Sequence, residues 1–366
     1  MDTLSLNMIQ TLIPLVWPAL LGGIFLQAIP DFMRPGLFFG VTVDARFRES
    51  QLARGIRRRY TTAIWSGTLT AIAIATTAAF AATRAVWAAT ALAVLVSRAE
   101  FRPVLLIPQL AVAFWAFARA NRATRPHALG PVGVVQVELS TRWEARGPLM
   151  AIIVLPLVLL IAIGLWAAIC WSHIPPQVAV HWSFSGPDRW VPKTPAAVMM
   201  LLSRRGIVCL LLALLAWGVL HGSRRIATSG TAARRERQFR VRMLALLIAA
   251  EYFAGFPAWA VLLGFPATIM TLWYLIWPAT ILVLLARLAL AGQGGSRGLP
   301  SADGALAGDR VQDRYWTWGL IYINRTDPAF LVEKRFGIGY TFNFGHPLAW
   351  LAITLIVAVP LMGRFA

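Results

Sequence analysis

Charged residues, cysteines and catalytic signatures are all scarce in this sequence. Only 13% of its 366 residues are charged, about half of the share that is usual in soluble domains. It contains no His-Glu-x-x-His, no Gly-x-Ser-x-Gly, no P-loop and no dinucleotide fingerprint. The common signatures of zinc peptidases, serine hydrolases, NTPases and NAD enzymes are therefore excluded. We predict no catalytic residue, no metal site and no cofactor.

The two cysteines, Cys170 and Cys209, show no Cys-x-x-Cys or Cys/His spacing of the kind that binds zinc. Both lie within or near apolar stretches, and both are expected near the outer ends of neighbouring helices. A disulfide between them is geometrically possible. Two small apolar thiols are the alternative.

Hydrophobic residues make up 58% of the chain and occur in long runs. One of these, Pro148–Ile169, reads "PLMAIIVLPLVLLIAIGLWAAI" and is long enough to cross a hydrocarbon core of about 30 Å as a single helix. The fold class that this pattern predicts is all-α, a polytopic transmembrane bundle of about eight spans. The expected crossings are residues 9–29, 61–82, 103–119, 149–171, 206–221, 243–263, 267–288 and 347–361. Residues 85–97 are too few for a crossing and are interpreted as a half-span or interfacial piece, which leaves the number of crossings between 61 and 119 open.

Arginine is distributed unevenly between the loops. The formal net charge is +19, and arginines crowd the segments 31–60, 119–147 and 222–242. Basic loops stay in the cytoplasm, so the N-terminus and the segment 174–193 are predicted outside a bacterial cytoplasmic (inner) membrane. Attraction between these arginines and anionic lipids of the bilayer then accounts for the positive charge. The lipid bilayer is the expected partner, and no nucleic acid is expected.

The same pattern divides the chain into six parts. They are an N-terminal membrane region (1–147), a span pair that carries the outer loop (148–221), a basic loop with a helical hairpin (222–291), a flexible Gly/Ser/Ala-rich linker (292–312), an aromatic cytoplasmic module (313–346) and a final span (347–366).

The outer segment 174–193, "IPPQVAVHWSFSGPDRWVPK", is rich in proline and aromatic residues. Its prolines restrict the unfolded backbone, so an ordered loop is expected, with a turn at Gly186-Pro187. His181 and Asp188 are predicted to approach each other across that turn. Such a pair suits an ion pair, part of a metal site or a general base, although two ligands do not close a metal site. A purely structural hydrogen bond that fixes the loop is the alternative. The binding candidates in this segment are His181, Trp182, Gly186, Asp188, Arg189, Trp190 and Lys193.

The segment 313–346 is dense in aromatic residues and carries turn-forming "NRTDP". It is interpreted either as a small docking or ligand module at the membrane face, or as an aromatic belt that seats the last helix. Its candidate residues are Tyr315, Trp316, Gly319, Tyr322, Asn324, Asp327, Lys334, Arg335, Gly337 and Asn343.

One carboxyl group is expected deep within the membrane. Glu251 lies nine residues beyond Arg242, about 13 Å along a helix, which is near mid-depth. An intramembrane carboxylate is a functional-site candidate. A protonated carboxyl that bonds a neighbouring helix is the alternative.

The outer segment resembles the signature of a bacterial membrane-protein family of unknown function that includes the SdpI-like immunity proteins. The matching residues are, in order, Ile174, Pro175, His181, Trp182, Gly186, Asp188, Trp190 and Lys193. The segment 313–346 resembles a second uncharacterised module that often accompanies the first, and "FFGVTVDARFRES" resembles the N-terminal part of such two-module proteins. The resemblance implies toxin immunity coupled to signalling through a sequestered regulator.

The leading functional hypothesis is therefore a non-catalytic SdpI-like immunity or sensing protein. Its outer loop would meet an extracellular peptide or envelope component, and its cytoplasmic module would bind a regulator. The alternative is a secondary transporter or membrane-embedded enzyme that uses Glu251.

Overall fold

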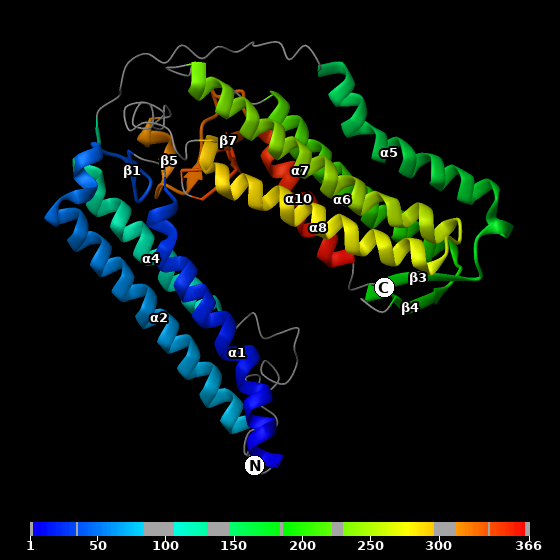
Figure 1. Ribbon diagram of the computed structural model, residues 1–366, viewed down its shortest axis with the longest axis horizontal. Helices are drawn as coiled ribbons and strands as arrows, with labels where there is room; N and C mark the ends of the chain where they lie inside the picture. The colour runs from blue at the N-terminus through cyan, green and yellow to red at the C-terminus, as the bar shows by residue number, and fades with distance from the viewer. Residues whose placement is uncertain are drawn as a thin grey trace. The chain divides into compact units, whose positions relative to one another are not determined.

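The computed structural model is mostly helical (Figure 1). It describes residues 3–33, 36–83, 106–129, 146–183, 186–221, 230–295, 312–335 and 337–362, so the expected half-span at 85–97 lies outside the described residues. The chain divides into two compact units. The N-terminal unit consists of Met1–Gly133, Val311–Leu320 and Arg335–Gly337, and the C-terminal unit of Val134–Arg310, Ile321–Lys334 and Ile338–Ala366.

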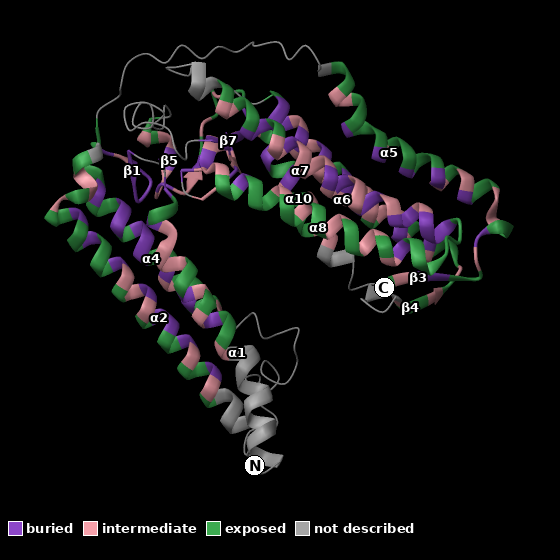
Figure 2. Ribbon diagram, in the orientation of Figure 1, coloured by how far each residue is buried: buried purple, intermediate pink, exposed green. Residues whose placement is uncertain are grey.

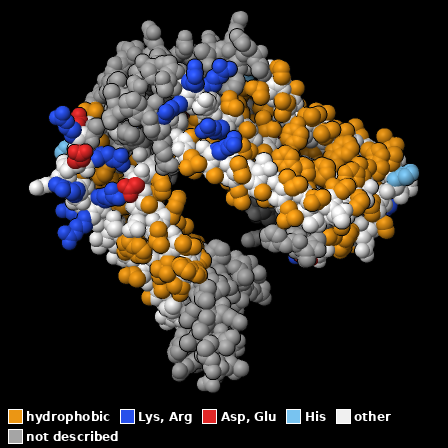
Figure 3. Space-filling view, in the orientation of Figure 1, with side chains coloured by type: hydrophobic (Ala, Val, Ile, Leu, Met, Phe, Trp, Pro, Cys, Tyr) orange, Lys and Arg blue, Asp and Glu red, His pale blue; other side chains and the backbone are white. Residues whose placement is uncertain are grey.

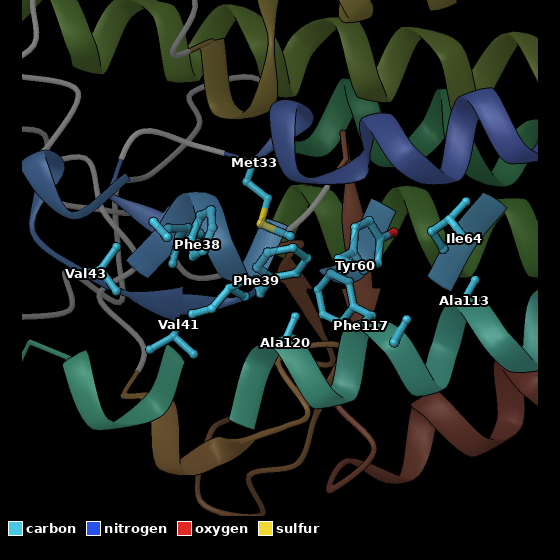
Figure 4. Packing of buried hydrophobic residues seen from close by; sticks show 14 residues of the cluster. Met33, Phe38, Phe39, Val41, Val43, Tyr60, Ile64, Ala113, Phe117 and Ala120 are labelled. Atoms are coloured by element: carbon cyan, nitrogen blue, oxygen red, sulfur yellow. The ribbon is translucent and has the colours of Figure 1, made fainter. Parts of the chain in front are cut away.

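In the described part of the N-terminal unit, the long helices are α1 (Thr3–Ala28), α2 (Gln51–Thr83) and α4 (Ile107–Thr124). A short hairpin of β1 (Leu37–Phe38) and β2 (Val41–Thr42) joins the first two. Buried aromatic and aliphatic side chains from the hairpin, α2 and α4 form one core, in which Phe39 packs against Tyr60 and Phe117 (Figure 4). Burial of this apolar surface holds the hairpin against the helices.

The long helices described in the C-terminal unit are α5 (Arg146–Ile169), α6 (Pro195–His221), α7 (Gly230–Leu262), α8 (Ala267–Ala291) and α10 (Pro347–Met362). Within the described residues, four segments are long and apolar enough to cross a membrane, namely Gly147–Ile169, Pro195–His221, Arg234–Leu262 and Ala267–Ala291. Val16–Phe32 and Pro347–Val359 are shorter apolar helices. Four membrane-spanning helices are thus supported, and the count of eight stays a prediction.

The outward faces of these helices suit lipid. Large apolar side chains such as Ile169 and Leu290 are 83% and 71% exposed, and exposed residues recur along α5 and α8 (Figure 2). In the N-terminal unit, the arginine side chains visible in Figure 3 gather at the end where α2 begins, and apolar side chains cover the helices beyond it. This separation of charge from apolar surface is typical of a membrane protein.

A proline inside α5 is compensated by α7. Pro156 has no N–H, so the carbonyl of Ile152, four residues earlier, loses its helical partner. The Tyr252 hydroxyl of α7 donates to that carbonyl at 3.2 Å, and the Trp259 indole N–H donates to the carbonyl of Leu159 at 3.1 Å. Side chains of α7 therefore bind the main chain of α5 along its length.

The strands are short additions to the helical bundle. β3 (Gln177–Ser183) pairs antiparallel with β4 (Gly186–Pro192), and β7 (Leu331–Glu333) pairs with β8 (Tyr340–Phe342). Two more strands, β5 (Trp316–Thr317) and β6 (Ile321–Tyr322), flank the turn at Trp318 and Gly319. The segment 174–193 thus contains a β-hairpin, Gln177–Pro192, which is called the outer hairpin after its predicted side of the membrane.

Two sequence expectations for the outer region were wrong in detail. Gly186 and Pro187 do not form the turn, since they begin β4 opposite Ser183 and Trp182. The expected span 206–221 is only the second part of a longer continuous helix, α6, which begins at Pro195. Proline is tolerated at Pro187 because a strand that pairs on one side only does not need every N–H.

Candidate functional site

The outer hairpin, Gln177–Pro192, is seated on the bundle by one part of its surface. Val178 and Ala179 are buried and belong to an apolar core with residues of α5, α6 and α7, and Val191 packs against the same core. His181, Asp188, Arg189 and Trp190 remain exposed. The buried strand residues therefore position the exposed ones, and the hairpin presents a fixed polar and aromatic surface.

His181 and Asp188 meet on the exposed side of the hairpin. The imidazole Nδ1 and the Asp188 Oδ1 lie 2.6 Å apart, and the side chains are 60% and 44% exposed. Arg189 is paired with His181 in the strand register, which bulges at this point. An ionised carboxylate only accepts hydrogen bonds, so Asp188 fixes a proton on Nδ1 and leaves Nε2 for another group.

Lys193 has a role that the sequence did not predict. Its ammonium group donates to the carbonyls of Trp171 and Ile174, at 3.0 Å each, and lies 5.5 Å from the centre of the Trp171 ring. These contacts bind the end of the hairpin to the segment that follows α5. Lys193 thus fixes the base of the hairpin, whereas the sequence placed it among the binding candidates.

The remaining predicted residues of this region are less informative. Trp190 is 50% exposed on β4. Trp182 and Gly186 lie in the two strands, but their side-chain surroundings lie outside what the structure describes. Cys170 and Cys209 are both free thiols, so the possible disulfide is absent. Among the described residues, no three His, Cys, Asp or Glu side chains gather where they could hold a metal ion.

Glu251 is fully buried in α7. Neither carboxyl oxygen has a hydrogen-bond partner among the described residues. The Cys209 thiol of α6 points at the Glu251 main-chain carbonyl, with a sulfur–oxygen distance of 3.6 Å, and Arg205 donates to the carbonyl of Ala254 at 3.2 Å. Cys209 and Arg205 therefore bond to main-chain carbonyls of α7 and not to the carboxyl group of Glu251.

Four predicted residues of the C-terminal segment form a hydrogen-bonded network in the C-terminal unit. The buried Asn343 amide donates to the carbonyls of Asn324, Asp327 and Ala329, and its oxygen accepts from the N–H groups of Asn324 and Gly345. Tyr322 donates to Asp327 at 2.8 Å. Because these bonds satisfy the main chain of the loop, the residues have structural roles. Nearby, Phe330 stacks on Trp217 of α6 at 5.9 Å, so this loop also packs against α6.

Five other predicted residues were Tyr315, Trp316, Gly319, Arg335 and Gly337, and all five belong to the N-terminal unit. The Arg335 side chain is only 1% exposed. It contacts Asp313 at 2.7 Å, donates to the Gly40 carbonyl at 2.6 Å and lies 4.8 Å from the centre of the Trp316 ring. Lys334 belongs to the C-terminal unit and is half-buried, with its N–H donating to the carbonyl of Gly339.

Sequence reasoning missed the partners of this arginine. Asp313 also accepts from the hydroxyl of Thr42 at 3.1 Å, and Asn121 of α4 donates to the Phe39 carbonyl at 2.8 Å. It also missed Gln109, a buried amide that donates to Thr68 and to the carbonyl of Ala19. The only sequence signal for these residues was a polar side chain within an apolar helix pattern. Their partners could not be predicted, because the contacts join residues as many as 295 positions apart.

Comparison with known families gives two matches. Residues 150–202, which cover most of α5, the outer hairpin and the start of α6, match a domain of unknown function (DUF1648). Residues 325–350 match a family of unknown function (DUF5808). No curated protein and no solved structure matches the chain. Together with the apolar helices, the two matches are consistent with a membrane protein of an uncharacterised kind.

Proposed function

We propose that this chain is a non-catalytic, SdpI-like immunity or sensing protein of the bacterial cytoplasmic membrane, with its N-terminus outside. In this proposal the outer hairpin meets an extracellular peptide or envelope component. The segment 313–346 passes the bound state inward or binds a cytoplasmic regulator. The observation that carries the proposal is the exposed His181–Asp188 pair on a hairpin that Val178 and Ala179 anchor in the bundle.

Ordering such a hairpin costs conformational entropy. A connector between two spans needs only a few polar residues, yet this one orders two seven-residue strands and leaves Trp190 half exposed. An aromatic ring beside charged groups is the composition that protein-binding surfaces favour. The His181–Asp188 contact itself is too exposed to stabilise the fold by much. A binding role therefore accounts for it better than a structural one.

The test compares His181→Ala, Asp188→Ala and the double variant in a sensitive bacterial host. Each variant is expressed together with each small secreted peptide that the neighbouring genes are found to encode, and survival is measured along with the amount of folded protein in the membrane. We expect each single variant to lose protection while it still inserts and folds. The double variant should lose no more than a single one, because the first substitution already removes the pair.

Arg58→Ala serves as the matched control, since Arg58 is exposed on α2 and lies outside both the hairpin and the segment 313–346. This variant should protect as the wild type does. A fully protective Asp188→Ala variant with lowered thermal stability would overturn the proposal and favour the structural role of the pair.

A second function, a transporter or membrane-embedded enzyme, is favoured by one observation only. Glu251 is buried in a helix that is long and apolar enough to cross a membrane, and its carboxyl oxygens have no partner among the described residues. Such a group is a place where a proton could be taken up and released during transport.

Reaction with a hydrophobic carbodiimide tests this alternative. The carboxyl oxygen adds to the central carbon of the reagent while the carboxyl proton goes to a nitrogen, so only a protonated and reachable group reacts. Labelling of Glu251 that Glu251→Gln abolishes, and that blocks uptake of a proton-coupled solute into vesicles, would favour the transporter. Labelling without any effect on solute uptake would count against it.

A further inference from the structure

The N-terminal unit contains two turns of the same unusual kind. In the first, Phe39 and Gly40 have φ angles of 45° and 73°, and in the second Trp318 and Gly319 have φ angles of 52° and 71°. Positive φ at both central positions defines the type I′ hairpin turn, which normally takes Asn-Gly. Among the described residues, Phe39 and Trp318 are the only residues other than glycine with positive φ. An aromatic residue is costly there, and such strain persists only where the surroundings impose it.

The two turns pack against each other through their glycines. A Cβ added to Gly40 would lie 2.7 Å from the Cα of Gly319, and one added to Gly319 would lie 2.9 Å from the Cα of Gly40. Both distances are too short for any side chain, so each turn leaves room for the main chain of the other. The two aromatic residues then point into apolar contacts. Phe39 is buried in the core shown in Figure 4, and Trp318 meets Phe114 of α4 edge to face at 5.1 Å.

Polar side chains of the N-terminal unit surround this contact. Asn121 of α4 donates to the Phe39 carbonyl, and its amide would meet a Cβ on Gly319 at 2.8 Å. Arg125, one turn further along α4, donates to the Trp316 carbonyl at 3.1 Å. The Thr42 N–H and hydroxyl both donate to Asp313. The second turn is thus held by directed hydrogen bonds as well as by apolar packing.

We propose that the N-terminal unit carries a binding slot for an aromatic–glycine turn, and that residues 312–320 of the same chain are its ligand. The slot is formed by Gly40, Thr42, Asn121 and Arg125, with Phe114 at its edge. The ligand reaches it through the Gly/Ser/Ala-rich segment 292–312, which separates it from the helices that precede it. Residues 312–320 then act as a clasp. While the clasp is docked, the slot is closed to any other peptide with such a turn, and its release opens the slot.

This proposal is independent of the outer hairpin and of Glu251. It rests only on residues of the N-terminal unit, and it predicts which substitutions release the clasp. It adds an interaction site that neither family match covers, because the matched residues are 150–202 and 325–350.

Photo-crosslinking in the full-length chain tests the proposal. Phe114 is replaced by p-benzoylphenylalanine, a photoreactive aromatic residue, and a specific protease sequence is inserted within residues 296–311. After irradiation and cleavage, a crosslink to residues 312–320 keeps the two fragments together on a denaturing gel at the size of one chain. The same probe at Trp115 is the positional control, since that side chain lies beside Arg119. We expect efficient joining from position 114 and little from position 115.

Three glycine variants then separate docking from backbone strain. Gly40→Ala and Gly319→Ala should each lower the crosslink yield about tenfold or more, because the added Cβ collides with the other turn. Gly337→Ala is the matched control. Gly337 has a φ of +68° in the same unit, but an added Cβ would meet nothing within 4 Å. Its crosslink yield should stay at the wild-type level.

Arg125→Gln provides a variant that leaves both turns unchanged. It removes the bond to the Trp316 carbonyl, and we expect the yield to fall several-fold while the protein stays monodisperse in detergent. Absence of a crosslink from position 114 would overturn the proposal. A crosslinked band at the size of two chains would overturn the assignment of the ligand to the same copy. An equal loss of yield in Gly337→Ala would show that strain, and not docking, controls the result.

Discussion

Two buried ionisable side chains, Arg335 in the N-terminal unit and Glu251 in the C-terminal unit, have opposite surroundings. Arg335 contacts a carboxylate, a main-chain carbonyl and an aromatic ring. The carboxyl oxygens of Glu251 have no hydrogen-bond partner among the described residues. A buried charge that is fully paired holds a fold together, whereas an unpaired one is costly unless it is neutral. Arg335 therefore has a structural role, whereas Glu251 stays a functional candidate. The sequence alone had suggested both residues as functional candidates.

The largest effect is expected when the lone carboxyl group is replaced by a cation. Glu251→Lys should cost several kcal/mol more than Glu251→Gln, since the amide is neutral and the ammonium group would have to lose its hydration in the bundle. Thermal unfolding in detergent and the yield of inserted protein measure this difference. Equal stability of the two variants would show that water reaches Glu251, and would remove the contrast with Arg335.

Loss of the paired arginine should come next. Arg335→Met should lower stability by about 3 kcal/mol, because it leaves the Asp313 carboxylate and the Gly40 carbonyl without their partner. Arg314→Met is the control, since Arg314 is exposed and lies on the Tyr315 ring, and we expect a change within about 0.5 kcal/mol. Chemical denaturation of the purified variants would give both values. Similar values for the two would mean that the buried pair contributes nothing.

A smaller loss is expected at the base of the outer hairpin. Lys193→Met keeps the length of the side chain but loses the two bonds to the carbonyls of Trp171 and Ile174, so stability should fall by about 1–2 kcal/mol. Hydrogen exchange at the amides of Gln177–Ser183 should rise at the same time. Arg189→Met, at an exposed position of the same hairpin, should leave that exchange unchanged. Unchanged exchange in Lys193→Met would return Lys193 to the binding surface.

The smallest effect on stability is expected for the exposed pair. A double-mutant cycle on His181 and Asp188 should give a coupling energy of at most about 1 kcal/mol, because both side chains are largely exposed and water screens them. Thermal unfolding of the wild type, two single variants and the double variant measures it. A coupling energy of several kcal/mol would make this pair structural, like Arg335 and Asp313.

The long apolar helices could be predicted, and four of them among the described residues are able to cross a membrane, because an apolar run of a given length has few alternatives there. The approach of His181 and Asp188 was also predictable, since only seven residues separate them along one hairpin. The strand character of Gly186 and Pro187 was not, because Gly-Pro is a turn signal whose local preference was overridden by pairing with Ser183 and Trp182. The structural role of Lys193 could not be predicted either, because its side chain bonds to main-chain carbonyls 19 and 22 positions away in the sequence.

By itself, the sequence determined that this is a helical membrane protein, which loops carry the positive charge and which segments are polar enough to leave the bilayer. These properties follow from the free energy of transferring each side chain from water to the bilayer. They do not depend on which residues surround that side chain in the folded protein. Only the tertiary structure decided that Arg335 is paired and that Glu251 is not. It also decided that the turns at Gly40 and Gly319, far apart in the chain, meet through their main chains. The cost of a buried charge and the room for a side chain depend on the atoms that surround them, and folding alone brings those atoms together.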